Sequence, residues 1–156
     1  MAASVCKHAL LLMLVSLNPL ALGSVRAELG SGTDSVIADR TQLQGDLITT
    51  VLGYYDVHEI ATAAGVHVRE FVNHSGVVFA VAWNGPVPPD LQPLLGVHYP
   101  DYLAALKSIQ HPGLHRSLRI AAGGLVVELG GHMRAYYGRA YLAYAIPAGV
   151  SAAELR

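Results

Sequence analysis

The sequence predicts an α+β protein with a single domain, residues 28–156, in which an antiparallel sheet of about six strands carries two or three helices. Two observations predict this class. Six short runs, in two groups of three along the chain, have the alternation or the apolar content of strands. Within each group the turns between runs are so short that they can form only hairpins, which makes neighbouring strands antiparallel. A stretch with helical features precedes each group. The length of 156 residues is typical of one domain.

The first 27 residues are expected to form a cleavable signal peptide. Lys7 gives a weakly basic start, an apolar run covers 9–15, and Val25-Arg26-Ala27 places small residues where signal peptidase cuts. The run is shorter than the roughly 20 apolar residues that span a bilayer, so no stable membrane span is expected after cleavage. We therefore expect an exported protein that acts in the periplasm or outside the cell.

The next part of the chain predicts one helix and three strands. Thr33 or Asp34 can cap a helix whose apolar residues recur at roughly helical spacing as far as Leu47. The strand-like runs cover 54–60, 66–72 and 77–83. The last of these is apolar on both sides, which indicates a central strand covered on both faces.

The remaining part of the chain repeats this order. Asp90 is expected to be the N-cap of a short helix that ends at Gly96, and Pro100-Asp101 restarts a helix through Ile109. Three further strand runs are expected at 117–121, at 125–129 and within 133–146. The repeated order suggests two similar halves; the alternative is a single antiparallel sheet with helices on one face.

Composition excludes several classes of function. The chain has 10 Lys and Arg against 11 Asp and Glu, so it lacks the net positive charge of a nucleic-acid binder. Its only cysteine, Cys6, precedes residue 28, which excludes a thiol nucleophile or thiolate zinc site in the exported part. His58-Glu59 is not followed by a second histidine at helical spacing, so the zinc-protease signature is missing. We expect no metal and no cofactor.

The segment 130–142 is the strongest candidate for a binding surface. It concentrates two arginines, one histidine and three tyrosines, and protein interfaces favour arginine and aromatic side chains. On a regular strand Arg134 and Arg139 point to opposite faces, unless Gly138 marks a bulge. In the alternative interpretation the tyrosines pack the sheet and each arginine pairs with a carboxylate such as Glu70 or Asp90.

Trp83 stands where a predicted strand meets a proline-rich loop. A single tryptophan at a strand end can fill the core or can stack on a ligand. Together with the residues of segment 130–142 and their possible carboxylate partners, this gives the candidate binding residues Glu70, Trp83, Asp90, His132, Arg134, Tyr137 and Arg139.

Several of these stretches carry a resemblance to a known family. The segments 57–60, 68–72, 76–96 and 130–142, followed by 146–150, resemble the exported proteobacterial family called domain of unknown function 2844. Phe71 stands where that family tends to have tyrosine, and Asn84 where it tends to have a basic residue, which puts an anion-binding role of that loop in doubt. The resemblance implies export and an architecture, and it assigns no catalytic residue.

The leading hypothesis is a non-enzymatic exported binding or accessory protein that acts through a protein or cell-envelope partner. The first alternative is an envelope-directed hydrolase that uses His132 or His58 with Glu59 or Glu70. The second is a small-ligand carrier in which Trp83 and tyrosines line a pocket.

Overall fold

The computed structural model describes residues 29–109 and 117–156, and the predicted signal peptide lies outside the described residues. The described chain forms one antiparallel sheet of seven strands in the order β1-β2-β3-β4-β7-β6-β5. The strands are β1 (Asp46–Val51), β2 (Tyr55–Ala61), β3 (His67–Asn73), β4 (Val78–Gly85), β5 (Ser117–Ala122), β6 (Leu125–His132) and β7 (Ala135–Leu142). The α+β class and the antiparallel pairing are confirmed.

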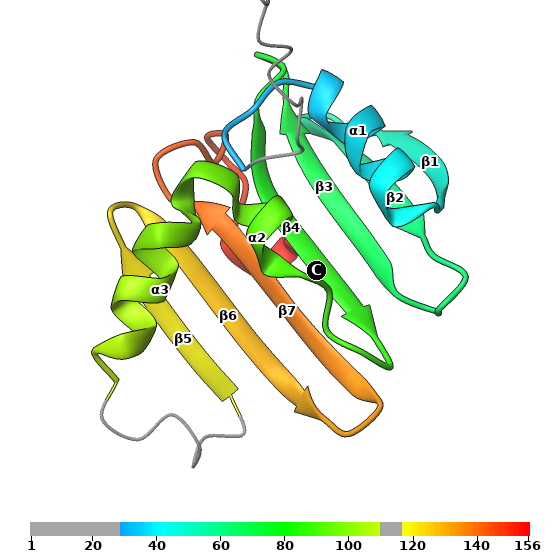
Figure 1. Ribbon diagram of the computed structural model, residues 1–156. Coiled ribbons are helices and arrows are strands. Elements are labelled where there is room, and N and C mark those ends of the chain that lie inside the picture. The colour runs from blue at the N-terminus through cyan, green and yellow to red at the C-terminus, as the bar shows by residue number, and fades with distance from the viewer. Residues whose placement is uncertain (1–28, 110–116) are drawn as a thin grey trace, which may run out of the picture.

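Three α-helices lie on one side of the sheet, which we call the helix face (Figure 1). Helix α1 (Asp34–Leu43) covers the part near β2 and β3, whereas α2 (Leu91–Leu95) and α3 (Tyr99–Lys107) cover the part near β5, β6 and β7. Asp90 is the N-cap of α2, as predicted, because its carboxylate accepts a hydrogen bond from the Gln92 backbone. Gly96 ends α2 with a φ of 51°.

The first predicted helix was too long, and the expected number of strands was therefore one too small. Helix α1 ends at Leu43, because Gln44 adopts a left-handed conformation with a φ of 50°. Gly45 then passes so close to β2 that a Cβ atom would lie 2.5 Å from the Ile60 side chain. Leu47 consequently belongs to the seventh strand, β1. No side chain caps α1: Thr33 is the N-cap residue but makes no capping hydrogen bond.

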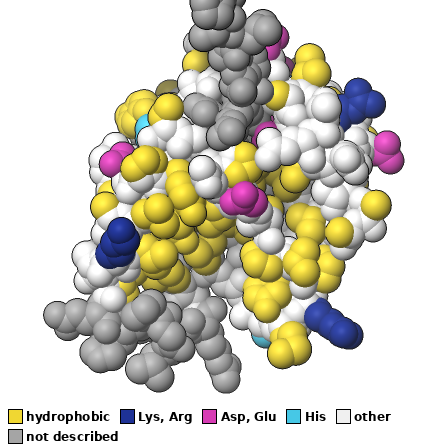
Figure 2. All heavy atoms as spheres, viewed as in Figure 1, with side chains coloured by type: hydrophobic (Ala, Val, Ile, Leu, Met, Phe, Trp, Pro, Cys, Tyr) yellow, Lys and Arg dark blue, Asp and Glu magenta, His cyan; other side chains and the backbone are white. Residues whose placement is uncertain are grey.

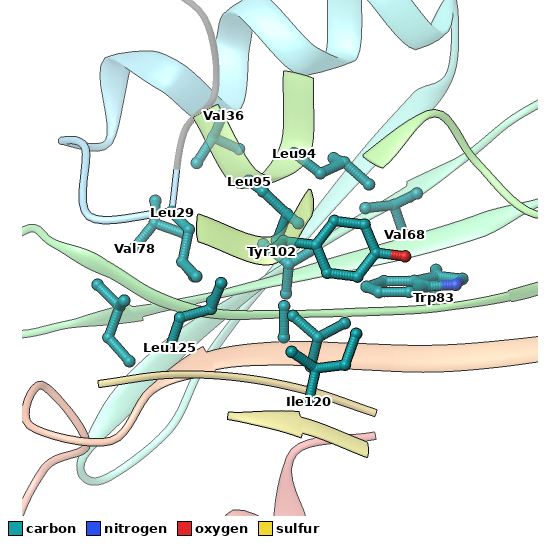
Figure 3. Close-up of a cluster of buried hydrophobic side chains, with 14 of the residues drawn as sticks. Leu29, Val36, Val68, Val78, Trp83, Leu94, Leu95, Tyr102, Ile120 and Leu125 are labelled. Atoms are coloured by element: carbon teal, nitrogen blue, oxygen red, sulfur yellow. The ribbon is translucent and has the colours of Figure 1, made fainter. Parts of the chain in front are cut away.

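The main apolar core lies between the helices and the sheet (Figure 3). Trp83 of β4 is only 3% exposed and packs in the same cluster as Leu94 of α2 and Tyr102 of α3. The aligned glycine of β7, Gly138, makes room for the indole, since a Cβ atom there would lie 2.4 Å from the Trp83 ring. Trp83 therefore has the core-filling position expected of a buried tryptophan.

The opposite side of the sheet, which we call the back face, carries a second core of aromatic residues. Tyr55, Phe71 and Phe79 have ring centroids 5.7–6.3 Å apart. A β-bulge between β3 and β4 leaves Phe79 without a paired residue and turns it and Ala80 toward this face. The segment after β7, residues 143–156, covers the cluster with the fully buried Leu155, and its red end lies behind the sheet in Figure 1.

Charged side chains are few and scattered on the helix face, where apolar groups form broad areas (Figure 2). No helix in residues 29–109 or 117–156 is both long and apolar enough to cross a membrane.

Candidate binding site

A groove of about 600 Å³ opens on the back face between β5, β6, β7 and the C-terminal segment. We call it the β7 groove. The polar residues that line it are Ser117, Arg119, Glu128, Tyr137, Arg139 and Arg156. Its position follows from the strand register, because Arg119, Glu128 and Arg139 occupy aligned positions on three neighbouring strands. Aligned residues of antiparallel strands point to the same face, so the three side chains meet.

Glu128 lies between the two arginines and binds both. Arg119 Nε donates to one carboxylate oxygen at 3.1 Å, and Arg139 Nη2 lies 2.6 Å from the other. Burial raises the pKa of Glu128, but hydrogen bonds and charge from Arg139 and Arg119 outweigh burial and lower the pKa below its ordinary value. Glu128 therefore stays ionised at neutral pH and orients both guanidinium groups.

Arg139 connects the sheet to the C-terminal segment. Its Nη1 donates to the backbone carbonyl oxygens of Ala152 and Leu155, and its guanidinium lies 5.9 Å from the centre of the Tyr141 ring. The side chain is only 24% exposed. Most of its hydrogen-bonding capacity is used inside the protein, so its main role in the groove is to hold the wall formed by residues 152–155.

Arg119, Tyr137 and Arg156 are accessible groups of the groove. The Arg119 side chain is 61% exposed. Its hydrogen bonds, first to Tyr141 and second to Glu128, raise the pKa of its guanidinium above the ordinary value. Tyr137 is 59% exposed. A ligand in the groove can therefore reach the guanidinium groups of Arg119 and Arg156 and the ring of Tyr137.

A second hollow, of about 370 Å³, shares the lining residue Tyr137 with the groove. We call it the rim hollow; its other side-chain contributors are Asn84, Pro86, Arg134, Ala135 and Tyr136. Arg134 is exposed and precedes β7, in a turn where its φ is 66°. It is not a strand residue, so the alternation that predicted opposite faces for Arg134 and Arg139 does not apply to it.

Basic side chains converge on these two hollows. Residues 29–109 and 117–156 contain seven Lys and Arg residues, and four of them line the groove or the rim hollow. The only acidic residue that lines either hollow in this part of the chain is Glu128. The site is therefore locally cationic on a chain with a formal net charge of −1.

The structure brings together three of the predicted binding residues, Arg134, Tyr137 and Arg139, and separates the others from them. His132 is exposed at the end of β6, where its ring contacts the Met133 carbonyl at 3.2 Å. Trp83 is in the core of the helix face, and Asp90 caps α2. Arg139 pairs with a carboxylate, as the alternative interpretation predicted, but its partner is Glu128 and not Glu70 or Asp90.

Glu70 has a different environment, under α1 on the helix face. Glu70 is 0% exposed, and its neighbour is the carboxyl of Asp39, which lies in α1 and is 1% exposed. Burial first, and then the hydrogen bond and charge of Asp39, raise the pKa of Glu70 to about 10. Glu70 is thus protonated at neutral pH, because burial and the neighbouring Asp39 carboxyl both disfavour a second charge between α1 and β3.

The residues of the hydrolase hypothesis are divided between the two faces. His58 is aligned with Glu70 on the helix face, and its ring nitrogen lies 2.8 Å from the Thr49 hydroxyl. Burial lowers the pKa of His58 although the charge of Asp56 opposes this. Glu59 points to the back face, where it binds His67 and Arg69 at 2.9 and 3.1 Å. In the described part of the chain, no three His, Cys, Asp or Glu side chains are placed to hold a metal ion.

Arg119, Glu128 and Arg156 were missed by the sequence reasoning. A signal for the first two was present: a hairpin reversing at Gly123-Gly124 aligns Arg119 with Glu128. No comparable pattern places Arg156 beside them, because its segment is irregular.

The comparisons with known proteins agree with the resemblance seen in the sequence. A family model described as protein of unknown function (DUF2844) matches residues 25–155. No curated protein and no solved structure matches the chain.

Proposed function

We propose that this chain, which belongs to the DUF2844 family of proteins of unknown function, is a non-enzymatic binding protein that holds an acidic segment of a protein partner in the β7 groove and the rim hollow. We further propose that it acts after export, in the periplasm or outside the cell. The observation that carries the binding proposal is the convergence of Arg119, Arg134, Arg139 and Arg156 on two adjoining hollows with one intervening acid.

The chemistry of the site favours carboxylates. A guanidinium group donates parallel hydrogen bonds that match the two oxygens of a carboxylate. Arg119 uses Nε for Glu128 and also hydrogen-bonds Tyr141, but its side chain is 61% exposed and so remains open to a ligand. Arg134 is exposed and forms no ion pair within the described residues. These two arginines are therefore the groups that we assign to the ligand.

The shape of the site favours an extended segment of a protein. The groove and the rim hollow meet at Tyr137, so a chain that runs from one to the other passes over its exposed ring. Aromatic and arginine side chains carry most of the binding energy in protein interfaces. A lipid headgroup layer is nearly flat, and it would contact the rim of these hollows more than their floor.

The test uses a fluorescein-labelled hexaglutamate peptide and measures fluorescence anisotropy with the full chain. Charge reversal at the two arginines assigned to the ligand, Arg119→Glu with Arg134→Glu, is expected to weaken binding at least about tenfold, which corresponds to about 1.4 kcal/mol. Arg139 is left unchanged, because it holds the C-terminal segment. The matched control, Arg40→Glu with Lys107→Glu, makes the same change of charge at exposed residues of α1 and α3.

Equal weakening by the two double variants would contradict the proposal, because binding would then follow total charge only. Absence of peptide binding to the wild-type chain would also contradict it. A parallel measurement with phosphatidylglycerol vesicles separates the two kinds of partner. Binding to vesicles without binding to the peptide would replace the protein partner with an anionic envelope lipid.

A further inference from the structure

Within residues 29–109 and 117–156, one edge of the sheet lacks the usual protection. β1 is the last strand in the sheet order and pairs only with β2 among the described strands. Five of its six residues are exposed. The backbone N–H and C=O groups on its open side are therefore available to another strand.

The side chains of β1 favour such pairing. Ile48 is 66% exposed and Val51 is 75% exposed, and they lie on opposite faces of the strand. The strand contains no lysine, proline or bulge, and its only charge is Asp46 at the first position. Natural proteins normally protect an edge with those devices. The other edge strand, β5, is better protected, since it carries the charged Arg119 and packs against α3.

We propose that β1 pairs in an antiparallel manner with β1 of a second copy of this chain, about a two-fold axis perpendicular to the sheet. Such an axis joins the two sheets into one and keeps the helices of both copies on the same face. Residues that oppose each other then lie on the same face, which permits a register with Ile48 opposite Ile48 of the second copy. That register also places Leu47 opposite Thr49.

The distribution of charge favours a second copy as the occupant. In the same register Asp46 opposes Thr50, and the two Asp46 side chains lie at opposite ends of the paired strands. The pairing thus buries no like charges against each other, which would destabilise it. An acidic or basic strand would find no counter-ion on β1 beyond that single terminal carboxylate, whereas a nearly neutral, β-branched strand such as β1 itself matches it.

This interface is independent of the proposed binding function. The β7 groove is formed by β5, β6 and β7, at the other edge of the sheet from β1. A dimer through β1 therefore leaves both grooves open, and failure of one proposal does not affect the other.

The test is sedimentation velocity of the full chain across a wide range of concentrations. We expect a dimer that Ile48→Lys and Val51→Lys each weaken at least about tenfold, because each substitution enters the interface from both copies. Val97→Lys is the matched control, since Val97 is 70% exposed in the short 3₁₀ helix Gly96–His98 on the other half of the protein. It should leave the dimer unchanged.

Hydrogen exchange then locates the contact. The amides of β1 should be protected in the wild-type dimer and exchange faster in Ile48→Lys. Because Ile48 and Val51 are exposed, both variants are expected to keep the fold, which circular dichroism checks. A wild-type chain that stays monomeric, or a dimer that survives both substitutions, would overturn the proposal.

Discussion

The buried pair formed by Asp39 and Glu70 predicts that the protein loses stability as the pH rises above neutral. The pKa of Glu70 is raised from 4.5 to about 10 in the folded protein. Between these two values the folded state binds a proton that the unfolded state has released. The stability contributed by this group is therefore fully present below pH 4.5 and is lost as the pH rises toward about 10.

The size of the effect follows from the same linkage. One bound proton changes the free energy of unfolding by about 1.4 kcal/mol for each pH unit. From pH 7 to pH 9 the loss is therefore about 3 kcal/mol, a large part of the 5–15 kcal/mol that is typical of a domain. Among the described groups with a shifted pKa, Glu70 is the one whose change of charge affects stability between pH 7 and pH 9. The pKa values of His58, Glu59 and Glu128 are lowered, and that of Tyr102 is raised from 10.

Urea unfolding followed by circular dichroism at pH 7, 8 and 9 measures this slope. Glu70→Gln keeps a hydrogen-bond donor for Asp39 and removes the titrating proton, so the slope should disappear. The matched control is Glu59→Gln on the neighbouring strand, whose carboxylate is 34% exposed and has a lowered pKa. It should retain the slope. A wild-type stability that does not change from pH 7 to pH 9, or a slope that persists in Glu70→Gln, would refute the reasoning.

Three further substitutions, each measured by urea unfolding, test the contacts of β7, the C-terminal segment and α2. Gly138→Ala should cost about 1–3 kcal/mol, because its Cβ atom would overlap the Trp83 ring, whereas Gly53→Ala, with nothing within 4 Å, should change stability by less than about 0.5 kcal/mol. Arg139→Ala should cost about 1–2 kcal/mol and speed hydrogen exchange in residues 152–156, because the guanidinium that donates to the Ala152 and Leu155 carbonyl oxygens is lost. Unchanged exchange would contradict this role. Asp90→Ala should cost about 1 kcal/mol through loss of the α2 cap, and an unchanged stability would show that the cap contributes little.

Most of the sheet could be predicted from local patterns in the sequence. The six predicted runs correspond to β2–β7, because alternating or continuous apolar residues bounded by glycine turns specify hairpins without knowledge of the rest of the fold. β1 was missed because Leu43 and Leu47 are four residues apart, which is also a helical spacing. The β-branched residues in 46–51 favoured a strand instead. The left-handed conformation of Gln44 ends the helix and so leaves these residues free to form β1.

The candidate site could be predicted only in part, because its residues come from different hairpins. Arg134, Tyr137 and Arg139 are close in the sequence, so composition alone could identify them. Arg119 becomes their neighbour only through the pairing of β5, β6 and β7, which is a property of the whole sheet. The environment of Glu70 was not predictable either, since it depends on where α1 docks.

Cross-linking of an acidic peptide to the full chain is the measurement that most directly tests whether the β7 groove is a binding site. A hexaglutamate peptide with a photoreactive benzophenone group is irradiated with the protein, and the attached residues are mapped by mass spectrometry. The proposed function predicts attachment at Tyr137 and at residues 117–119 or 152–156 around it. Attachment on α1, α2 or α3, or no attachment at all, would contradict it.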